Sequence, residues 1–564
     1  MNNYYGINPY GALPSARQLK HLKEFGKKAF FHFGVNTFSN MEWGNGEEAE
    51  SLFNPSETDV RQWIKTIKAA GFTLAILTVK HHDGFCLWPS EYTEHTVAKS
   101  PYKGGKGDIL REFTDACHEY DIAVGIYISP WDRNSKYWGS NEYSKFFNSQ
   151  LTEVLSNYGK IDEVWWDGAG STETPYDWGM WAHTIRNLQP EAVIFGSLGA
   201  TPYVEMHWVG NEHGHAGDPH YCTIDAISVE KEITPEMNSG KIGGNRFIVA
   251  EVDTSIRPGW FYHKEQDYFV KSTKQLVDLW FDSIGKSAVM LLNFPPDRRG
   301  LVHELDSTNA IEAHNIISKA LSVNYALEGT AKASSERCPD LRGEQILNGN
   351  PDTFWCPDEG DQKPSVEITL PKKRTFDTVI IGEFIELGVR IGGFTFEAEI
   401  DGKWQLITEK KSIGYKKAVH FEPITASKVR LTLTEFADVP LIRDFGLYSF
   451  REAGYSPIET RVAPGDKFDI TTNPSVSYEY HDDGLVVMIG GLFPFNTIKF
   501  CGDGIEEFEV LAFNGTQFYS VYKGTNPAHE ETVRLSETIT GSYQFKLLTH
   551  RKETTNLDVH VYEY

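Results

Sequence analysis

The chain has 564 residues, of which 40% are hydrophobic and 23% charged, and its formal net charge is −24. A chain of this length and composition folds into several domains with sizeable cores, which excludes a disordered, collagen-like or coiled-coil protein. The negative charge argues against a nucleic-acid partner or an anionic membrane, since both need clustered cations, and no run approaches the ~20 apolar residues of a membrane span.

Neither the start of the chain nor its cysteines point to export. No basic start followed by an apolar run is visible, so the sequence read literally predicts a cytoplasmic protein, although a removed export signal would leave the same sequence. The six cysteines include no C-x-x-C pair, which predicts reduced thiols and neither a zinc ribbon nor a redox motif.

Short apolar runs alternate with helical periodicity over about the first 320 residues, a pattern typical of a parallel sheet covered by helices. The predicted strands are Lys28–Gly34, Leu74–His82, Val124–Pro130, Glu163–Gly168, Val193–Ser197, Met206–Gly210, Phe247–Asp253 and Ser287–Phe294. Apolar positions with helical spacing predict helices over Asp59–Ala70 and Ile109–Tyr120. Eight strands predict a (β/α)₈-like (TIM-type) barrel. The barrel is expected to be irregular, because Leu198–Glu205 is too short for a helix with two loops.

After about Leu321 the long helical patterns end, and short alternating strands with Gly, Asp and Pro turns predict an all-β region. We predict two β-sandwiches there. The expected domains are a catalytic barrel over residues 1–320, a first sandwich over 321–453 and a second over 454–564.

Polar residues follow several predicted barrel strands at their carboxyl ends, where the catalytic groups of such barrels gather. These candidate site residues are His32, Glu42, Trp43, His81, His82, Trp88, Tyr127, Trp166, Asp167, Glu212, Glu251, Arg257 and Trp260. A carboxylate such as Asp167, at the tip of an apolar strand, must be hydrated, paired or used in chemistry. A helix N-cap is the structural alternative.

Three functions compete for these residues. Glycoside hydrolysis needs two carboxyl groups across one sugar bond, and Asp167 with Glu212 or Glu251 supplies them. Imidazoles would bind sugar hydroxyls, while indoles would cover an apolar sugar face. A metal-dependent hydrolase would instead use ligands among His81, His82, Glu212, His213 and His215. However, adjacent histidines point to opposite sides of a strand unless the strand has ended. A carbohydrate-binding protein without chemistry is the third possibility.

A series of motifs over about residues 15–300 resembles the α-L-fucosidases of glycoside hydrolase family 29. The motifs are F-H-F-G from Phe31, Glu42-Trp43, K-H-H-D-G-F from Lys80, G-I-Y-I-S from Gly125, E-V-W-W-D-G from Glu163 and W-V-G-N-E from Trp208. The resemblance implies retaining hydrolysis of a fucosylated glycan, without a metal or an organic cofactor. It also implies that Asp167 is the nucleophile.

The resemblance carries further implications for individual residues. Those it places around the fucose ring are His32, Glu42, Trp43, His81, His82, Tyr127 and Trp166. The W-V-G-N-E motif is similar to the branch that prefers α-1,3 and α-1,4 linkages to N-acetylglucosamine, as in Lewis antigens. That similarity implies that Glu212 is the acid/base. Glu251, for which Arg257 is the expected partner, is the second candidate. A broad-specificity fucosidase remains the alternative.

The block from Asn324 to Phe450 resembles a discoidin-type (F5/8 C) sandwich, similar to carbohydrate-binding modules. L-N-G-N-P-D-T-F-W from Leu347 and D-G-K-W from Asp401 carry this resemblance. We expect Trp355 and Trp404 to belong to its core rather than to a ligand surface.

Overall fold

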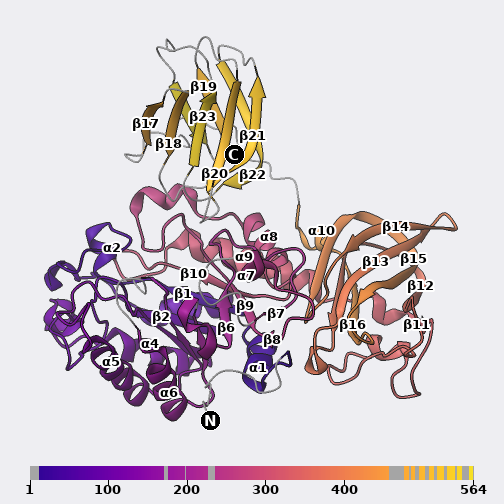
Figure 1. Cartoon of the computed structure of the whole chain (residues 1–564), viewed down its shortest axis with the longest axis horizontal. Coiled ribbons are helices and arrows are strands. Elements are labelled where there is room, and N and C mark those ends of the chain that lie inside the picture. The colour runs from indigo at the N-terminus through magenta and orange to yellow at the C-terminus, as the bar shows by residue number, and fades with distance from the viewer. Residues whose placement is uncertain are drawn as a thin grey trace. The chain divides into compact units, whose positions relative to one another are not determined.

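The chain divides into two compact units, one of residues 1–256 with 271–457 and one of residues 257–270 with 458–564. The computed structural model describes residues 12–169, 176–196, 198–225 and 235–456, and strands beyond residue 475. Figure 1 shows the whole chain and labels most of its helices and strands.

Eight parallel strands close into a barrel in the order β1-β10-β9-β6-β5-β4-β3-β2. They are β1 (Lys27–Phe31), β2 (Leu74–Lys80), β3 (Ala123–Ile128), β4 (Glu163–Trp165), β5 (Val193–Phe195), β6 (Met206–Trp208), β9 (Val249–Ser255) and β10 (Val289–Asn293). Each predicted run overlaps one of them, so the predicted barrel is confirmed. Strands buried on both faces are rich in apolar residues, as in β2, where all seven residues are buried and only Thr78 and Lys80 are polar.

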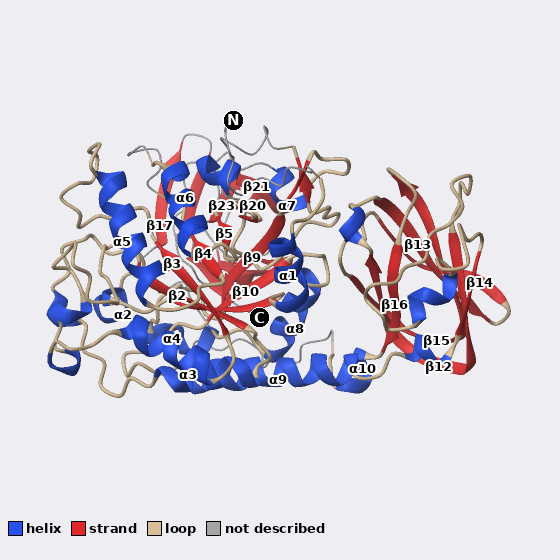
Figure 2. Cartoon of the chain, turned by 90° about the horizontal axis from the view of Figure 1, so that it is seen from below, coloured by secondary structure: helices blue, strands red, loops and turns tan. Residues whose placement is uncertain are grey.

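Helices cover the barrel (Figure 2). In chain order they are α1 (Ala16–Glu24), α2 (Val35–Ser39), α3 (Val60–Ala69), α4 (Ile109–Glu119), α5 (Tyr143–Asn157), α6 (Trp178–Leu188), α7 (Pro235–Ser239), α8 (Thr273–Asp282) and α9 (Glu304–Leu321). Both predicted helices are confirmed as α3 and α4. Each begins at an aspartate whose side chain accepts a backbone N–H, Asp59 for α3 and Asp108 for α4.

The expected irregularity lies between β5 and β6. Only a 3₁₀ helix, Leu198–Tyr203, connects these strands in the described part of the chain. Between β6 and β9 the chain adds α7 and the strand pair β7 (Thr223–Ile224) with β8 (Arg246–Phe247).

The discoidin-like domain is an antiparallel sheet in the order β11-β12-β15-β13-β14, with β16 paired to β12. Its strands are β11 (Thr330–Ala333), β12 (Ser365–Glu383), β13 (Ile391–Ile400), β14 (Lys403–Lys410), β15 (Lys417–Phe436) and β16 (Ile442–Tyr448), followed by α10 (Phe450–Ala453). Trp355 is fully buried in its core, as expected. Trp404 is half-buried, with the Arg430 guanidinium 4.4 Å from its ring centroid.

The described strands beyond residue 475 form two antiparallel sheets, ordered β17-β18-β23-β20-β21 and β22-β19-β24. They are β17 (Val476–His481), β18 (Gly484–Ile489), β19 (Phe495–Cys501), β20 (Glu507–Phe513), β21 (Phe518–Thr525), β22 (Glu530–Ile539), β23 (Tyr543–Leu548) and β24 (Asp558–Tyr562). The region is thus all-β, while the exact domain boundaries stay predictions.

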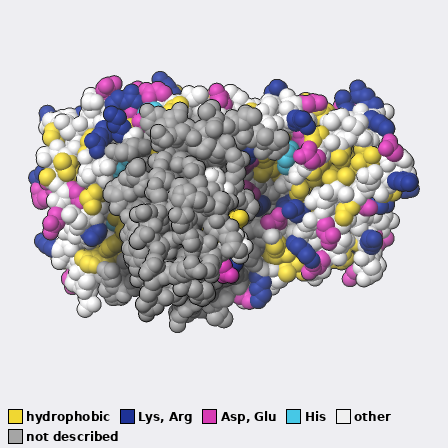
Figure 3. All heavy atoms as spheres, turned by 90° about the horizontal axis from the view of Figure 1, so that it is seen from above, with side chains coloured by type: hydrophobic (Ala, Val, Ile, Leu, Met, Phe, Trp, Pro, Cys, Tyr) yellow, Lys and Arg dark blue, Asp and Glu magenta, His cyan; other side chains and the backbone are white. Residues whose placement is uncertain are grey.

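Where its residues are described, the face in Figure 3 mixes basic and acidic side chains. Among the described helices, none is both long enough and apolar enough to cross a bilayer.

Candidate active site

Asp167 lies two residues beyond the end of β4, among hydrogen-bond donors. The Tyr127 hydroxyl donates to its Oδ2 at 3.0 Å, and the Ala169 backbone N–H donates to its Oδ1 at 2.8 Å. His82 Nε2 lies 3.7 Å from Oδ2. Helix α6 is capped by Asp177 instead, so Asp167 does not have the helix-capping role considered as its alternative. Its side chain keeps 29% exposure, which leaves it open to a ligand.

Two adjacent histidines and a tyrosine line the same side of the site. The His81 ring stacks on Tyr127 with centroids 5.6 Å apart, and it lies 4.1 Å from the His82 ring. His82 Nδ1 is 2.7 Å from the Ser129 hydroxyl. Both histidines reach one cluster because β2 ends at Lys80, so the alternation of strand side chains no longer separates them.

His32 completes this wall. Its Nδ1 lies 3.0 Å from Asn293 Oδ1, and its ring meets that of His81 edge to face. Burial lowers the pKa of His32 to about 3 and holds the pKa values of His81 and His82 below their usual range, although Asp167 opposes the shift at His82. The three imidazoles are therefore neutral at pH 7. Neutral imidazoles suit hydrogen bonding to hydroxyl groups.

The loop after β1 places Trp43 beside the histidines. Trp43 is 56% exposed, and its ring meets those of His82 and Trp131 edge to face at 6.0 and 5.9 Å. The neighbouring Glu42 is half-buried, and its carbonyl accepts a hydrogen bond from the Asn36 side chain at 3.3 Å. An exposed indole held in this way can pack on the apolar face of a sugar.

A pocket of about 200 Å³ lies at these strand ends. It is lined by Trp165, Trp166, Asp167, Gly168, Ala169, Phe195, Trp208, Glu212 and Asp253. Its volume is below the roughly 300–1,000 Å³ of pockets for drug-sized ligands, so it suits one sugar ring. Two predicted carboxylates, Asp167 and Glu212, thus share one pocket. Glu212 is exposed to solvent.

A third carboxyl group, Asp253, lines the same pocket and was not assigned a role from the sequence. It is 4% exposed, and its Oδ1 has no hydrogen-bond partner among the described residues. Burial raises the pKa of Asp253 well above its usual range, and Glu212, Glu251 and Asp167 add to this shift. These surroundings therefore favour the protonated form of Asp253. The sequence did contain a signal for Asp253. It lies two residues from Glu251, and residues two apart on a strand point to the same face.

Glu251 lies deeper in the barrel and is fully buried. Its Oε2 is 2.6 Å from Lys28 Nζ, and its Oε1 accepts a hydrogen bond from the Trp165 indole at 2.7 Å. Lys28 is also 2.6 Å from Glu163, so one ammonium joins two buried carboxyl groups. This network holds the interior of the barrel together, and it occupies both oxygens of Glu251.

Two predicted tryptophans have packing roles. Trp88 is 1% exposed, and its indole donates to Glu153 on α5 at 3.0 Å. The expectation that Trp88 covers a sugar face is thus wrong, because the loop after His82 folds back alongside β2. Trp166 borders the pocket, but its fully buried ring packs against Trp178 and Trp181.

Arg257 and Trp260 belong to the segment 257–270, which groups with the second unit. Within that segment the Arg257 guanidinium is 2.7 Å from Asp267 and lies over the ring of Tyr262. Their role in substrate binding stays a prediction.

The metal-site alternative finds no support in the side-chain geometry. In the described part of the chain, no group of three His, Cys, Asp or Glu side chains is placed to hold a metal ion.

Comparisons with known proteins show the family of the chain. The Alpha-L-fucosidase family model matches residues 15–313, and the F5/8 type C domain model matches residues 330–445. The chain is 35% identical over 472 residues to Alpha-L-fucosidase 1 of Arabidopsis thaliana, which covers 80% of this chain and 91% of the relative.

Solved structures extend the likeness to three dimensions. A Bacteroides thetaiotaomicron crystal structure superimposes with a TM-score of 0.76 and 42% identity, covering 79% of this chain and 98% of that one. A Ruminococcus gnavus fucosidase in complex with fucose gives a TM-score of 0.73 and 31% identity over 81% of this chain and 99% of its own. With its barrel, its pocket and these matches, the chain belongs to the alpha-L-fucosidase family, glycoside hydrolase family 29.

Proposed function

We propose that the chain is a retaining exo-acting α-L-fucosidase with Asp167 as nucleophile and Glu212 as acid/base. An Asp167 oxygen bonds to the anomeric carbon of fucose while Glu212 gives its proton to the departing glycosidic oxygen. Glu212 then takes a proton from water, whose oxygen replaces Asp167 on the anomeric carbon. Two displacements return the original anomeric configuration.

The shared pocket of Asp167 and Glu212 is the observation that carries this proposal. The Tyr127 hydroxyl donates a hydrogen bond to Asp167 Oδ2 and so helps to hold that side chain at the pocket. Glu212 meets solvent at the mouth of the pocket, where a leaving glycan departs and water enters. Glu251 is the weaker acid/base candidate because Lys28 and Trp165 engage both of its oxygens.

We further propose that the substrates are α-1,3 and α-1,4 fucosyl branches on N-acetylglucosamine, as in Lewis-type glycans. The motif from Trp208 to Glu212 supports this preference, since Trp208 and Glu212 both border the pocket. A pocket sized for one ring suits removal of a terminal fucose.

Release of free fucose from Lewis a, Lewis x and a 2-linked fucoside tests this assignment. Release from the two branched antigens alone is expected. Equal release from all three would favour the broad-specificity alternative. Binding without release would favour a carbohydrate-binding protein.

Glu212→Gln is expected to lower kcat on Lewis a by about 10²–10⁴-fold, because the departing sugar needs a proton. On an aryl fucoside with a good leaving group, formation of the fucosyl-enzyme should be nearly unaffected, so a burst of phenol should precede slow turnover. Glu251→Gln is the matched control and should not show this dependence on the leaving group. A burst given by Glu251→Gln alone would move the acid/base role to Glu251.

Asp253→Asn is expected to stabilise the protein at neutral pH. The pKa of Asp253 is higher in the folded protein than in the unfolded chain, where it is about 4, so this residue lowers the stability as pH rises above about 4. The gain in unfolding free energy should be near zero at pH 4 and grow by at most about 1.4 kcal/mol for each pH unit above it. Chemical denaturation at several pH values measures this gain. If the stability of Asp253→Asn instead falls relative to that of the wild type between pH 4 and pH 7, Asp253 is ionised in the folded protein and the prediction is wrong.

A further inference from the structure

A second cavity, of about 240 Å³, lies at the amino-terminal ends of the barrel strands, opposite the end that carries Asp167. Lys27, the first residue of β1, borders it together with helix α9 and residues 415–416 of the discoidin-like domain. The titratable side chains around it are Lys23, Lys27, His314, Tyr415 and Lys416, and among the described residues no Asp or Glu lines it. Much of the remaining wall is apolar, including Trp280 and Ile317.

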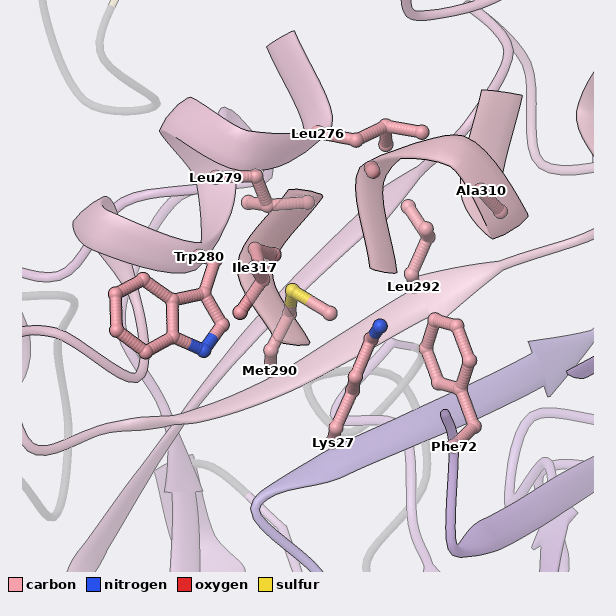
Figure 4. A pocket seen from close by; sticks show the side chains of 10 residues that line it. Lys27, Phe72, Leu276, Leu279, Trp280, Met290, Leu292, Ala310 and Ile317 are labelled. Carbon is pink, nitrogen blue, oxygen red and sulfur yellow. The ribbon is translucent and has the colours of Figure 1, made fainter. Parts of the chain in front are cut away.

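The amino group of Lys27 lies among apolar side chains. Figure 4 draws a smaller apolar pocket, which shares Lys27, Trp280 and Ile317 with this cavity, and shows the Lys27 amino group beside Phe72. Its Nζ lies 4.4 Å from the Phe72 ring centroid and donates to the Ala70 carbonyl at 2.5 Å. Burial lowers the pKa of Lys27 to about 7. No carboxylate forms an ion pair with it among the described residues.

Lys416 also forms no ion pair with a carboxylate among the described residues, although Asp444 acts on it electrostatically, and both Asp444 and Glu386 pair with other cations. Glu386 lies 2.7 Å from Lys23, and Asp444 lies 2.5 Å from Arg443. Burial lowers the pKa of Lys416. Two ammonium groups thus border one cavity without an ion-pair partner, in the part of the chain that the structure describes.

We propose that this cavity binds a small organic carboxylate, whose oxygens accept hydrogen bonds from Lys27 and Lys416 and whose apolar body packs on Trp280 and Ile317. A carboxylate supplies the missing countercharge. The apolar wall favours such a ligand over an inorganic oxyanion, which would leave that wall unfilled.

The site is built before a ligand arrives. The Ser287 hydroxyl, which precedes β10, donates to the Ile413 carbonyl at 2.9 Å and accepts the Lys416 backbone N–H at 3.0 Å. The backbone of Lys416 is therefore fixed to the barrel. A bound carboxylate would add a further link between the barrel and the discoidin-like domain.

Thermal unfolding of the full chain with benzoate, at an ionic strength held constant with sodium chloride, tests the proposal. Benzoate should raise Tm, and Lys27→Met and Lys416→Met should each weaken its binding about ten- to hundredfold. Lys332→Met, at an exposed position of β11, is the control and should retain wild-type binding.

Calorimetry of the wild-type protein at pH 8 gives a readout that needs no variant. Lys27 is mostly neutral there, so binding should take up protons and the enthalpy should depend on the buffer's ionisation heat. Absence of benzoate binding, or equal binding by the Lys27→Met/Lys416→Met double variant, would overturn the proposal. Lysine-dependent binding of inorganic phosphate without benzoate binding would overturn the carboxylate assignment. Because binding is measured without hydrolysis, these outcomes are independent of the proposed fucosidase mechanism.

Discussion

Asp167→Gly is expected to lower kcat for fucose release by about 10⁴-fold or more, because the variant lacks the atom that bonds to the anomeric carbon. Folding should be retained, since the lost contacts are two hydrogen bonds at a partly exposed side chain. Steady-state kinetics on an aryl fucoside measure the loss.

Azide should restore part of this activity, because a small anion can occupy the space of the missing carboxylate and attack the same carbon. The product is then a fucosyl azide of inverted configuration. Asp177→Asn is the matched control, because it changes an aspartate after the same strand whose role is to cap α6, and asparagine caps helices equally well. Wild-type turnover by Asp167→Gly would refute the assignment of the nucleophile.

Lys28→Met is expected to lower the free energy of unfolding by about 3–5 kcal/mol. The substitution removes the cation shared by Glu163 and Glu251, each 2.6 Å from its Nζ, and leaves two fully buried carboxyl groups without that cation. Urea denaturation followed by tryptophan fluorescence measures the change.

Lys20→Met provides the comparison for a surface pair. Lys20 lies 3.4 Å from Asp162 and keeps 34% side-chain exposure, so its loss should cost at most about 1 kcal/mol. Equal losses in the two variants would contradict a special role for the buried network. A triple variant, Lys28→Met with Glu163→Gln and Glu251→Gln, should recover part of the loss, because no uncompensated charge then remains.

The sequence predicted the barrel well because most of the parallel strands are rich in apolar residues, as expected of strands that are covered on both faces. The prediction also placed Asp167 at a strand end. Which side chains lie next to Asp167 depends on the residues at which the neighbouring strands end. His81 and His82 face one cluster only because β2 ends at Lys80, and chain periodicity alone does not locate that end.

Other parts of the site depend on the course of the loops and on how deeply a side chain is buried. The pattern of apolar and polar residues along the chain does not determine either of these. Trp88 follows the histidines closely in sequence, yet its loop turns back and buries its ring against α5. Glu251 and Asp253 lie on the same face of β9 but at different depths in the barrel. Glu251 is bound by Lys28, whereas Asp253 borders the pocket. The sequence offers no measure of that depth.

The anomeric form of the fucose first released tests most directly whether Asp167 and Glu212 act by double displacement. Proton NMR spectra recorded in the first minutes of hydrolysis, before mutarotation, distinguish the two anomers. We expect α-L-fucose to appear first and the β-anomer to follow only as the solution equilibrates. Initial appearance of β-L-fucose would contradict a covalent intermediate on Asp167, because a single displacement by water inverts the configuration.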